Sequence, residues 1–222
     1  MIVLQEVGVA KKMKMYQKIE SSIESFNINT ITEGRKQLLN ELVGYTLQRI
    51  GEEKPVNLNF ICTHNSRRSH LSQIWAQTMA AFYDVPHVCC YSGGTEATAM
   101  FPVVGETLAS QGFVISKLAE QKNPVYAIRY DSLSQAMIVF SKKYDDTFNP
   151  KSNYGAIMTC ASADEGCPVV MGAQVRLPIL YNDPKVSDGT PDQVKVYLER
   201  SVQIGTEMKY VFHQVRELVD KT

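Results

Sequence analysis

The sequence predicts an α/β fold: a four-stranded parallel sheet with helices on both faces, preceded by an N-terminal helical hairpin. Three observations lead to it. From residue 56 onward, short apolar runs alternate with stretches of helical periodicity. The chain has 222 residues, of which 44% are hydrophobic, enough for a core. The segment Gly51-Glu52-Glu53-Lys54-Pro55 breaks the pattern that precedes it, so residues 1–54 are predicted to be an N-terminal helical extension of a domain at 55–222.

The elements follow from periodicity. In the extension, helices are expected at 16–26 and 32–50; apolar residues of the second recur at helical spacing, from Leu38 to Ile50. In the domain, strands are expected at 56–61, 88–92, 136–140 and 156–159, and helices at 68–83, 103–111 and 191–219. Ligands of such sheets bind beyond the carboxyl ends of the strands, and Cys62 and Cys160 each follow a predicted strand.

The composition excludes several classes of protein. With 23 basic and 23 acidic residues the net charge is zero, which argues against a nucleic-acid partner. No apolar run approaches the length of a membrane span, and the N-terminus lacks the features of a signal peptide, so we expect a cytoplasmic protein. Five cysteines in a reducing compartment indicate catalysis, metal binding or burial rather than a disulfide framework.

The segment Cys62-Thr63-His64-Asn65-Ser66-Arg67-Arg68-Ser69 joins the first predicted strand to a helix. At such a turn the N–H groups of 63–68 can face one concavity, and the helix N-terminus adds partial positive charge. Arg68 adds a fork for two oxyanion oxygens, and the same field favours the thiolate of Cys62. Ser69 is placed to donate a hydrogen bond to that thiolate, and Asn65 to brace the loop. The pattern predicts an oxyanion site with a nucleophile at its base.

Other residues of this segment are open to two interpretations. His64 and His70 are each candidates for a general base, but a surface or loop position is favoured for both. The side chain of Arg67 either strengthens anion binding or points to solvent, and the second is slightly favoured.

Cys160 and Cys167 form a second group of thiols. They are interpreted as reactive thiols. The alternatives are half of a zinc site or two buried thiols without a chemical role. No second Cys/His pair has suitable spacing, so no metal site is predicted. The adjacent Cys89 and Cys90 are interpreted as strand residues.

The segment 62–69 resembles the nucleophile loop of the low-molecular-weight protein tyrosine phosphatases, and still more that of the thioredoxin-coupled arsenate reductases of the same fold. The resemblance continues at Tyr91-Ser92-Gly93-Gly94-Thr95-Glu96, at Cys160 and Cys167, and at Asn182-Asp183-Pro184, in the order of the family. It covers residues 56 to the C-terminus and leaves 1–54 outside.

The resemblance implies roles for the matched residues. Cys62 would be the nucleophile, Arg68 the oxyanion clamp, Ser69 the thiolate-stabilising hydroxyl and Asp183 the general acid. It also implies a redox relay in which Cys160 and Cys167 carry a disulfide away from Cys62 for reduction by thioredoxin, with no tightly bound cofactor.

The leading hypothesis is therefore an arsenate reductase of arsenic detoxification. The alternative is a protein tyrosine phosphatase with a Cys62 phosphocysteine intermediate. A third is a non-enzymatic anion or redox sensor. Lys185 stands where the phosphatases usually carry an aromatic residue, which counts against phosphotyrosine. The oligomeric state, the role of 1–54 and the separation of Cys62 and Cys160 stay open.

Overall fold

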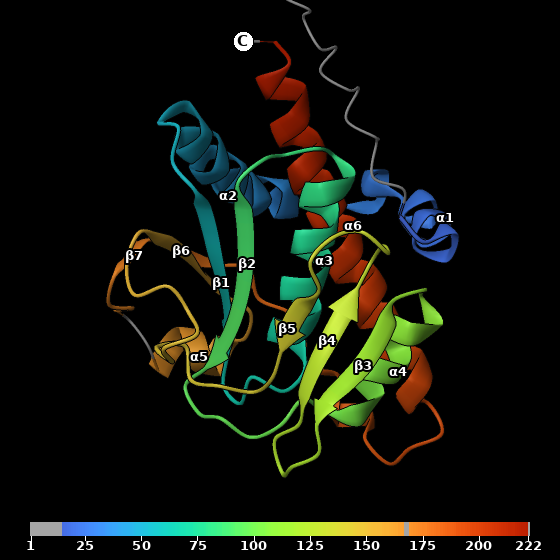
Figure 1. The fold of residues 1–222 in the computed structure, drawn as a ribbon. Coiled ribbons are helices and arrows are strands. Elements are labelled where there is room, and N and C mark those ends of the chain that lie inside the picture. Colours follow the sequence, from blue (N-terminus) through green and yellow to red (C-terminus); the bar gives the residue numbers. More distant parts are fainter. Residues whose placement is uncertain (1–14, 167–168, 222) are drawn as a thin grey trace, which may run out of the picture.

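Four parallel strands form the central sheet of the computed structural model, which describes residues 15–166 and 169–221 (Figure 1). Their order is β2 (Val88–Gly94), β1 (Val56–Cys62), β6 (Tyr154–Met158) and β7 (Ala173–Pro178). Every neighbouring pair is parallel, and the register sets Cys62 beside Gly94. The carboxyl ends of β1, β2 and β6 therefore meet at one edge of the sheet.

Helices cover both faces of this sheet, as predicted. On one face, Leu58 and Phe60 of β1 join a large core with α2 (Glu33–Gly51), α3 (Arg68–Phe82) and α6 (Gln193–Val219). On the other face, Ile61 packs in a smaller cluster with Ala163 of the short helix α5 (Ala161–Gly166). Leu58 and Phe60 lie in one cluster and Ile61 in the other because successive residues of a strand face opposite ways. The predicted α/β fold class is confirmed.

One predicted strand belongs elsewhere. Residues 136–140 contain β5 (Met137–Val139), but β5 lies in a second, antiparallel sheet with β3 (Val114–Ala119) and β4 (Val125–Arg129), beyond α4 (Pro102–Ser110). Its assignment to the parallel sheet was wrong, and the fourth parallel strand is β7. The sequence Ala-Gln-Val-Arg-Leu-Pro of β7 lacks an apolar run because β7 is a half-exposed edge strand.

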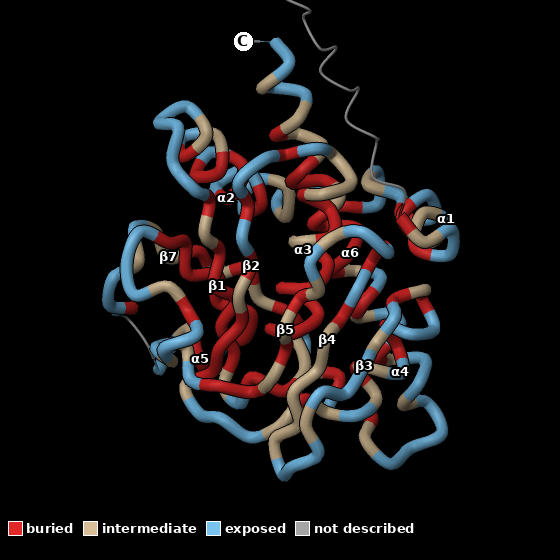
Figure 2. The backbone as a smooth tube through the Cα atoms, in the orientation of Figure 1, coloured by how far each residue is buried: buried red, intermediate tan, exposed pale blue. Residues whose placement is uncertain are grey.

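The N-terminal hairpin packs into the same core as the sheet. It consists of α1 (Gln17–Ser25), a turn of 3₁₀ helix, η1 (Ile28–Thr30), and α2. Ile19 and Ile23 of α1 and Leu39 and Leu42 of α2 are fully buried, and in Figure 2 both helices alternate between buried and more exposed residues. Phe26, just after α1, meets the ring of Trp75 edge-on, with centroids 5.0 Å apart. Phe26 also lies so close to α6 that a Cβ on Gly205 would come within 2.4 Å of its ring.

The described helices include none that is both long and apolar enough to cross a membrane.

Candidate active site

The loop between β1 and α3 has an unusual backbone. Asn65 adopts a left-handed conformation, with φ at 43°, which Asn tolerates better than most residues. The end of β2 runs directly beneath the loop: a Cβ on Gly94 would lie 2.6 Å from the carbonyl oxygen of Thr63 and 2.7 Å from the nitrogen of Asn65. Glycine at 94 is therefore required for the loop to approach β2 this closely.

The peptide groups of the loop are oriented by their neighbours. Their carbonyls accept hydrogen bonds from outside: those of Cys62 and Thr63 from the amides of Thr95 and Glu96 at 3.1 and 2.8 Å, and that of Ser66 from Phe101 at 3.0 Å. Within the described part of the chain, the N–H groups of 63–67 donate to no protein group. Carbonyls turned outward and unpaired N–H groups are the arrangement of an anion-binding loop.

Cys62 lies at the base of this loop. The thiol is buried, and its Sγ lies 3.1 Å from the hydroxyl of Ser69. The Ser69 oxygen accepts a hydrogen bond from the side-chain NH2 of Asn65 at 2.9 Å, and the side-chain oxygen Oδ1 of Asn65 accepts one from the backbone N–H of Lys142, also at 2.9 Å. Because Ser69 accepts from Asn65, its own proton is available to Cys62. The structure thus brings the side chains of Cys62, Asn65 and Ser69 together.

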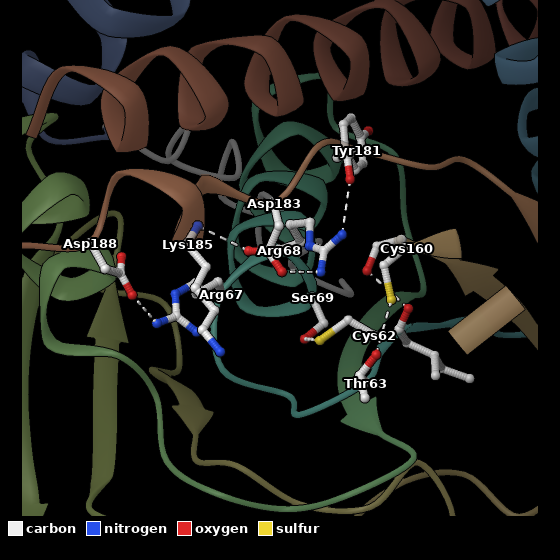
Figure 3. A network of polar contacts seen from close by, with 12 residues as sticks. Cys62, Thr63, Arg67, Arg68, Ser69, Cys160, Tyr181, Asp183, Lys185 and Asp188 are labelled. Carbon is white, nitrogen blue, oxygen red and sulfur yellow. Dashed lines mark hydrogen bonds and ion pairs between the residues drawn. The ribbon is translucent and has the colours of Figure 1, made fainter. Parts of the chain in front are cut away.

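Arg68 connects the loop to the segment that carries Asp183 (Figure 3). One terminal nitrogen lies 2.5 Å from the Asp183 carboxylate, and the other donates to the carbonyl of Tyr181 at 3.0 Å. The second carboxylate oxygen of Asp183 accepts from the amide of Lys185, at the start of the 3₁₀ helix η2 (Pro184–Ser187). A small pocket above Cys62 is lined by Cys62, His64, Ser66, Arg67, Arg68 and Asp183. The thiol of Cys62, the guanidinium of Arg68 and the carboxyl group of Asp183 therefore surround one space.

Arg67 differs from its expected orientation toward solvent. Its side chain is only 13% exposed, and its guanidinium lies 2.6 Å from Asp188 and 2.5 Å from the hydroxyl of Tyr197. It also lies over the ring of Phe101, 4.1 Å from the centroid. None of these three partners stands out in the sequence, because each lies far from Arg67 along the chain.

The two histidines near the loop have different environments. His64 is half exposed, and its ring lies 3.6 Å from the carboxylate of Glu96. His70 is fully buried, so the prediction of a surface or loop position was wrong; its Nδ1 lies 3.1 Å from the hydroxyl of Ser92. Burial, together with the positive charge of Lys142, lowers the pKa of His70 to about 3. Because this pKa lies far below 7, the His70 ring stays neutral near pH 7 and is not suited to proton transfer there.

Cys160 lies directly after β6 and is buried, with 1% of its surface exposed. Its Sγ is 3.5 Å from the hydroxyl of Thr63, the residue that follows Cys62, and both thiols belong to the smaller buried cluster. Figure 3 shows the two side chains in the same region of the site. Helix α5 follows, held to β7 by Arg176, 2.6 Å from Asp164. Cys167 lies outside the described residues.

No group of three or more His, Cys, Asp or Glu side chains that could hold a metal ion occurs among residues 15–166 and 169–221.

No protein-family model matches the sequence, and a search of curated proteins found no match. Solved structures similar to this chain include a low-molecular-weight phosphotyrosine phosphatase from Vibrio cholerae O395, at 12% identity and a TM-score of 0.47, over 75% of this chain and 95% of the other. An arsenate reductase from Archaeoglobus fulgidus DSM 4304 is 18% identical, with a TM-score of 0.42, over 70% and 98%. The YwlE arginine phosphatase from Geobacillus stearothermophilus is 14% identical, with a TM-score of 0.45, over 75% and 97%.

Proposed function

We propose that this protein reduces arsenate to arsenite through three cysteines and is recycled by thioredoxin in the cytoplasm. The oxyanion is bound by the N–H groups of 63–68 and by the guanidinium of Arg68. Cys62 is the nucleophile, Ser69 stabilises its thiolate, and Asp183 is the general acid. Cys160 and Cys167 form the disulfide that leaves the site.

The first step joins sulfur to arsenic. The thiolate of Cys62 attacks arsenate, the bond from arsenic to one of its hydroxyl groups breaks, and the departing hydroxyl takes a proton from Asp183 and leaves as water. The product is a Cys62–arsenic(V) adduct. Arsenic is not yet reduced at this point, so a source of two electrons is required.

The next steps move those electrons. The thiolate of Cys160 attacks the sulfur of Cys62; the S–As bond breaks, its electron pair stays on arsenic, and arsenite leaves. The resulting Cys62–Cys160 disulfide is attacked by Cys167, which frees Cys62 and leaves a Cys160–Cys167 disulfide. The dithiol of thioredoxin reduces this disulfide by thiol exchange.

The observation that carries the proposal is the position of Cys160. Its thiol touches the residue next to the nucleophile, within the same buried cluster. A phosphatase that uses Cys62, Arg68 and Asp183 needs no second thiol there. The helix between Cys160 and Cys167 has six residues, too few to be stable alone, which suits a segment that must rearrange during the relay.

Arsenate-dependent oxidation of NADPH, coupled through thioredoxin and its reductase, tests the proposal. The wild type should turn over, Cys160→Ser should not, and Cys89→Ser should behave as the wild type because Cys89 is an exposed residue of β2. Hydrolysis of p-nitrophenyl phosphate by Cys160→Ser should be retained. If neither activity depends on Cys160, the reductase proposal fails and the phosphatase alternative takes its place.

A further inference from the structure

Two adjacent arginines hold both ends of one short helix. Arg68 pairs with Asp183 immediately before η2, and Arg67 pairs with Asp188 immediately after it (Figure 3). Their side chains diverge although the residues are neighbours. The segment that carries the carboxyl group is therefore attached to the nucleophile loop at two points about one helical turn apart.

The attachment through Arg67 is a closed network. Its Nη2 lies 2.6 Å from one oxygen of Asp188, its Nε donates to the hydroxyl of Tyr197, and that hydroxyl donates to the other oxygen of Asp188 at 2.6 Å. Phe101 supports it: the ring lies against the guanidinium and stacks on Tyr197, with centroids 5.7 Å apart. We name Arg67, Phe101, Asp188 and Tyr197 the Arg67 clamp.

This network has the features of a strong attachment. Tyr197 is fully buried, and the Arg67 and Asp188 side chains are 13% and 24% exposed, so solvent screens the pair less than it screens a surface pair. Burial, then the Asp188 carboxylate, raises the pKa of Tyr197, so its hydroxyl keeps its proton for Asp188. Both Asp188 oxygens are bonded, which fixes the end of η2 in orientation as well as position.

We propose that Arg67 is a positioning residue for Asp183 and that its guanidinium is not an oxyanion ligand. The clamp holds the far end of η2 against α6, and Pro184 and the Asp183–Lys185 contact transmit that position to the carboxyl group. Arg68 alone cannot hold Asp183 during turnover, because the same guanidinium must also bind the oxyanion. This inference rests on the role of Asp183 in the proposed function.

The chemistry gives a specific readout. With a phosphomonoester as probe, the S–P bond to Cys62 forms as the P–O bond breaks, the electron pair leaves on oxygen, and Asp183 supplies a proton to that oxygen. A poor leaving group depends on this proton more than a good one. A misplaced Asp183 should therefore slow phenyl phosphate more than p-nitrophenyl phosphate, and should leave the binding of inorganic phosphate nearly unchanged.

The test uses Arg67→Gln and Asp188→Asn, with Arg216→Gln as the matched control, since Arg216 forms an Arg–Asp pair with Asp220 far along α6. For both clamp variants we expect kcat on phenyl phosphate to fall about tenfold, a part of the roughly 10²-fold contribution of a general acid. The loss on p-nitrophenyl phosphate should be smaller, and the Ki of inorganic phosphate should stay within about twofold. In an Asp183→Asn background, Arg67→Gln should cause no further loss.

Hydrogen exchange provides a readout that does not depend on activity. Amides of 183 and 185–190 should exchange about tenfold faster in Arg67→Gln, with no change in Arg216→Gln. Unchanged exchange overturns the proposal. The proposal is also overturned if Arg67→Gln raises the Ki of inorganic phosphate while slowing phenyl phosphate and p-nitrophenyl phosphate equally. That result would make Arg67 an oxyanion ligand. If the wild type does not turn over arsenate, the proposed function is refuted. The phosphomonoester kinetics and the hydrogen exchange would still test the role of Arg67.

Discussion

Ser69 is the one side chain that contacts the sulfur of Cys62 by a hydrogen bond among those described, at 3.1 Å. In the proposed function Cys62 reacts as a thiolate, so replacing Ser69 by alanine would remove a hydrogen bond to a charged group, which is worth roughly 1.5–3 kcal/mol. We expect Ser69→Ala to lower kcat/KM for the proposed reduction of arsenate by about 10- to 100-fold. It should also slow the alkylation of Cys62 by iodoacetamide at pH 7.

The control for Ser69→Ala lies three residues further along α3. Ser72 is buried, and its hydroxyl has no hydrogen-bond partner among the described residues. Ser72→Ala should leave both rates unchanged and should not lower stability. Equal losses in the two variants would mean that α3 tolerates no change here and that the Cys62–Ser69 contact has no special role.

At this scale the sequence was informative where contacts are local. Cys62, Asn65 and Ser69 lie within eight residues, so the loop motif predicts their contacts. Asp188 and Tyr197 were missed because their contact with Arg67 depends on how η2 and α6 cross the site. The burial of His70 was not predicted, because the residues that precede it in the sequence are polar and do not indicate a buried position.

At the scale of elements, the contact between β2 and the loop makes a prediction about Gly94. A Cβ there would clash with backbone atoms of Thr63 and Asn65, and the backbone cannot relieve the clash by changing rotamer as a side chain can. We expect Gly94→Ala to lower stability by roughly 1–3 kcal/mol and to reduce activity more than stability alone explains. Urea denaturation and phosphate inhibition measure the two effects.

Gly44 provides the matched glycine. It lies in the middle of α2, and a Cβ there would meet nothing within 4 Å. Gly44→Ala should stabilise the protein by about 0.5–1 kcal/mol, because alanine favours a helix, and should leave activity unchanged. A Gly94→Ala variant that behaves in the same way would contradict the close approach described here.

Elements with strong periodicity were predictable and weak strands were not. The helices at α2, α3 and α6 and the strands β1 and β2 match apolar patterns closely. The strands β3 and β7 are short and partly exposed. Polar residues interrupt both of them, Ser116 and Lys117 in β3 and Gln174 and Arg176 in β7, so neither has an unbroken apolar run. The membership of β5 depends on pairing with β4, which no local pattern specifies.

For the whole molecule, His70 predicts a dependence of stability on pH. Its pKa is about 3 in the folded protein, below its usual 6.5, because it is buried beside the positive charge of Lys142. The unfolded chain takes up this proton below about pH 6.5 and the folded chain does not, so stability falls as pH falls toward 3. The slope from this residue approaches about 1.4 kcal/mol per pH unit.

Urea denaturation at pH 7, 6, 5 and 4 measures this dependence. His70→Gln should flatten it, whereas His213→Gln, on the partly exposed side of α6, should retain the dependence of the wild type. Parallel curves for the wild type and His70→Gln would show that His70 is not the group responsible.

The core that the N-terminal hairpin shares with the sheet predicts whether residues 55–222 can fold without the hairpin. Leu39 of α2 is fully buried, whereas Leu38 is 37% exposed. Leu39→Ala should lower the free energy of unfolding by about 2–5 kcal/mol and Leu38→Ala by less than about 1. A fragment of residues 55–222 should lack a cooperative unfolding transition, because the core residues of α1 and α2 are missing. Cooperative unfolding of that fragment would instead support an independent domain after residue 54.

The outward carbonyls of the loop between β1 and α3 have a consequence for mutational tolerance. The preference of the pocket for a negative charge depends on the direction of its peptide planes, and these are set by Gly94, Thr95, Glu96 and Phe101. In a library with every residue of 62–101 varied, the side chains of Thr63, His64 and Ser66 should accept many replacements without loss of anion binding. Gly94 should accept almost none, although it would never touch the anion.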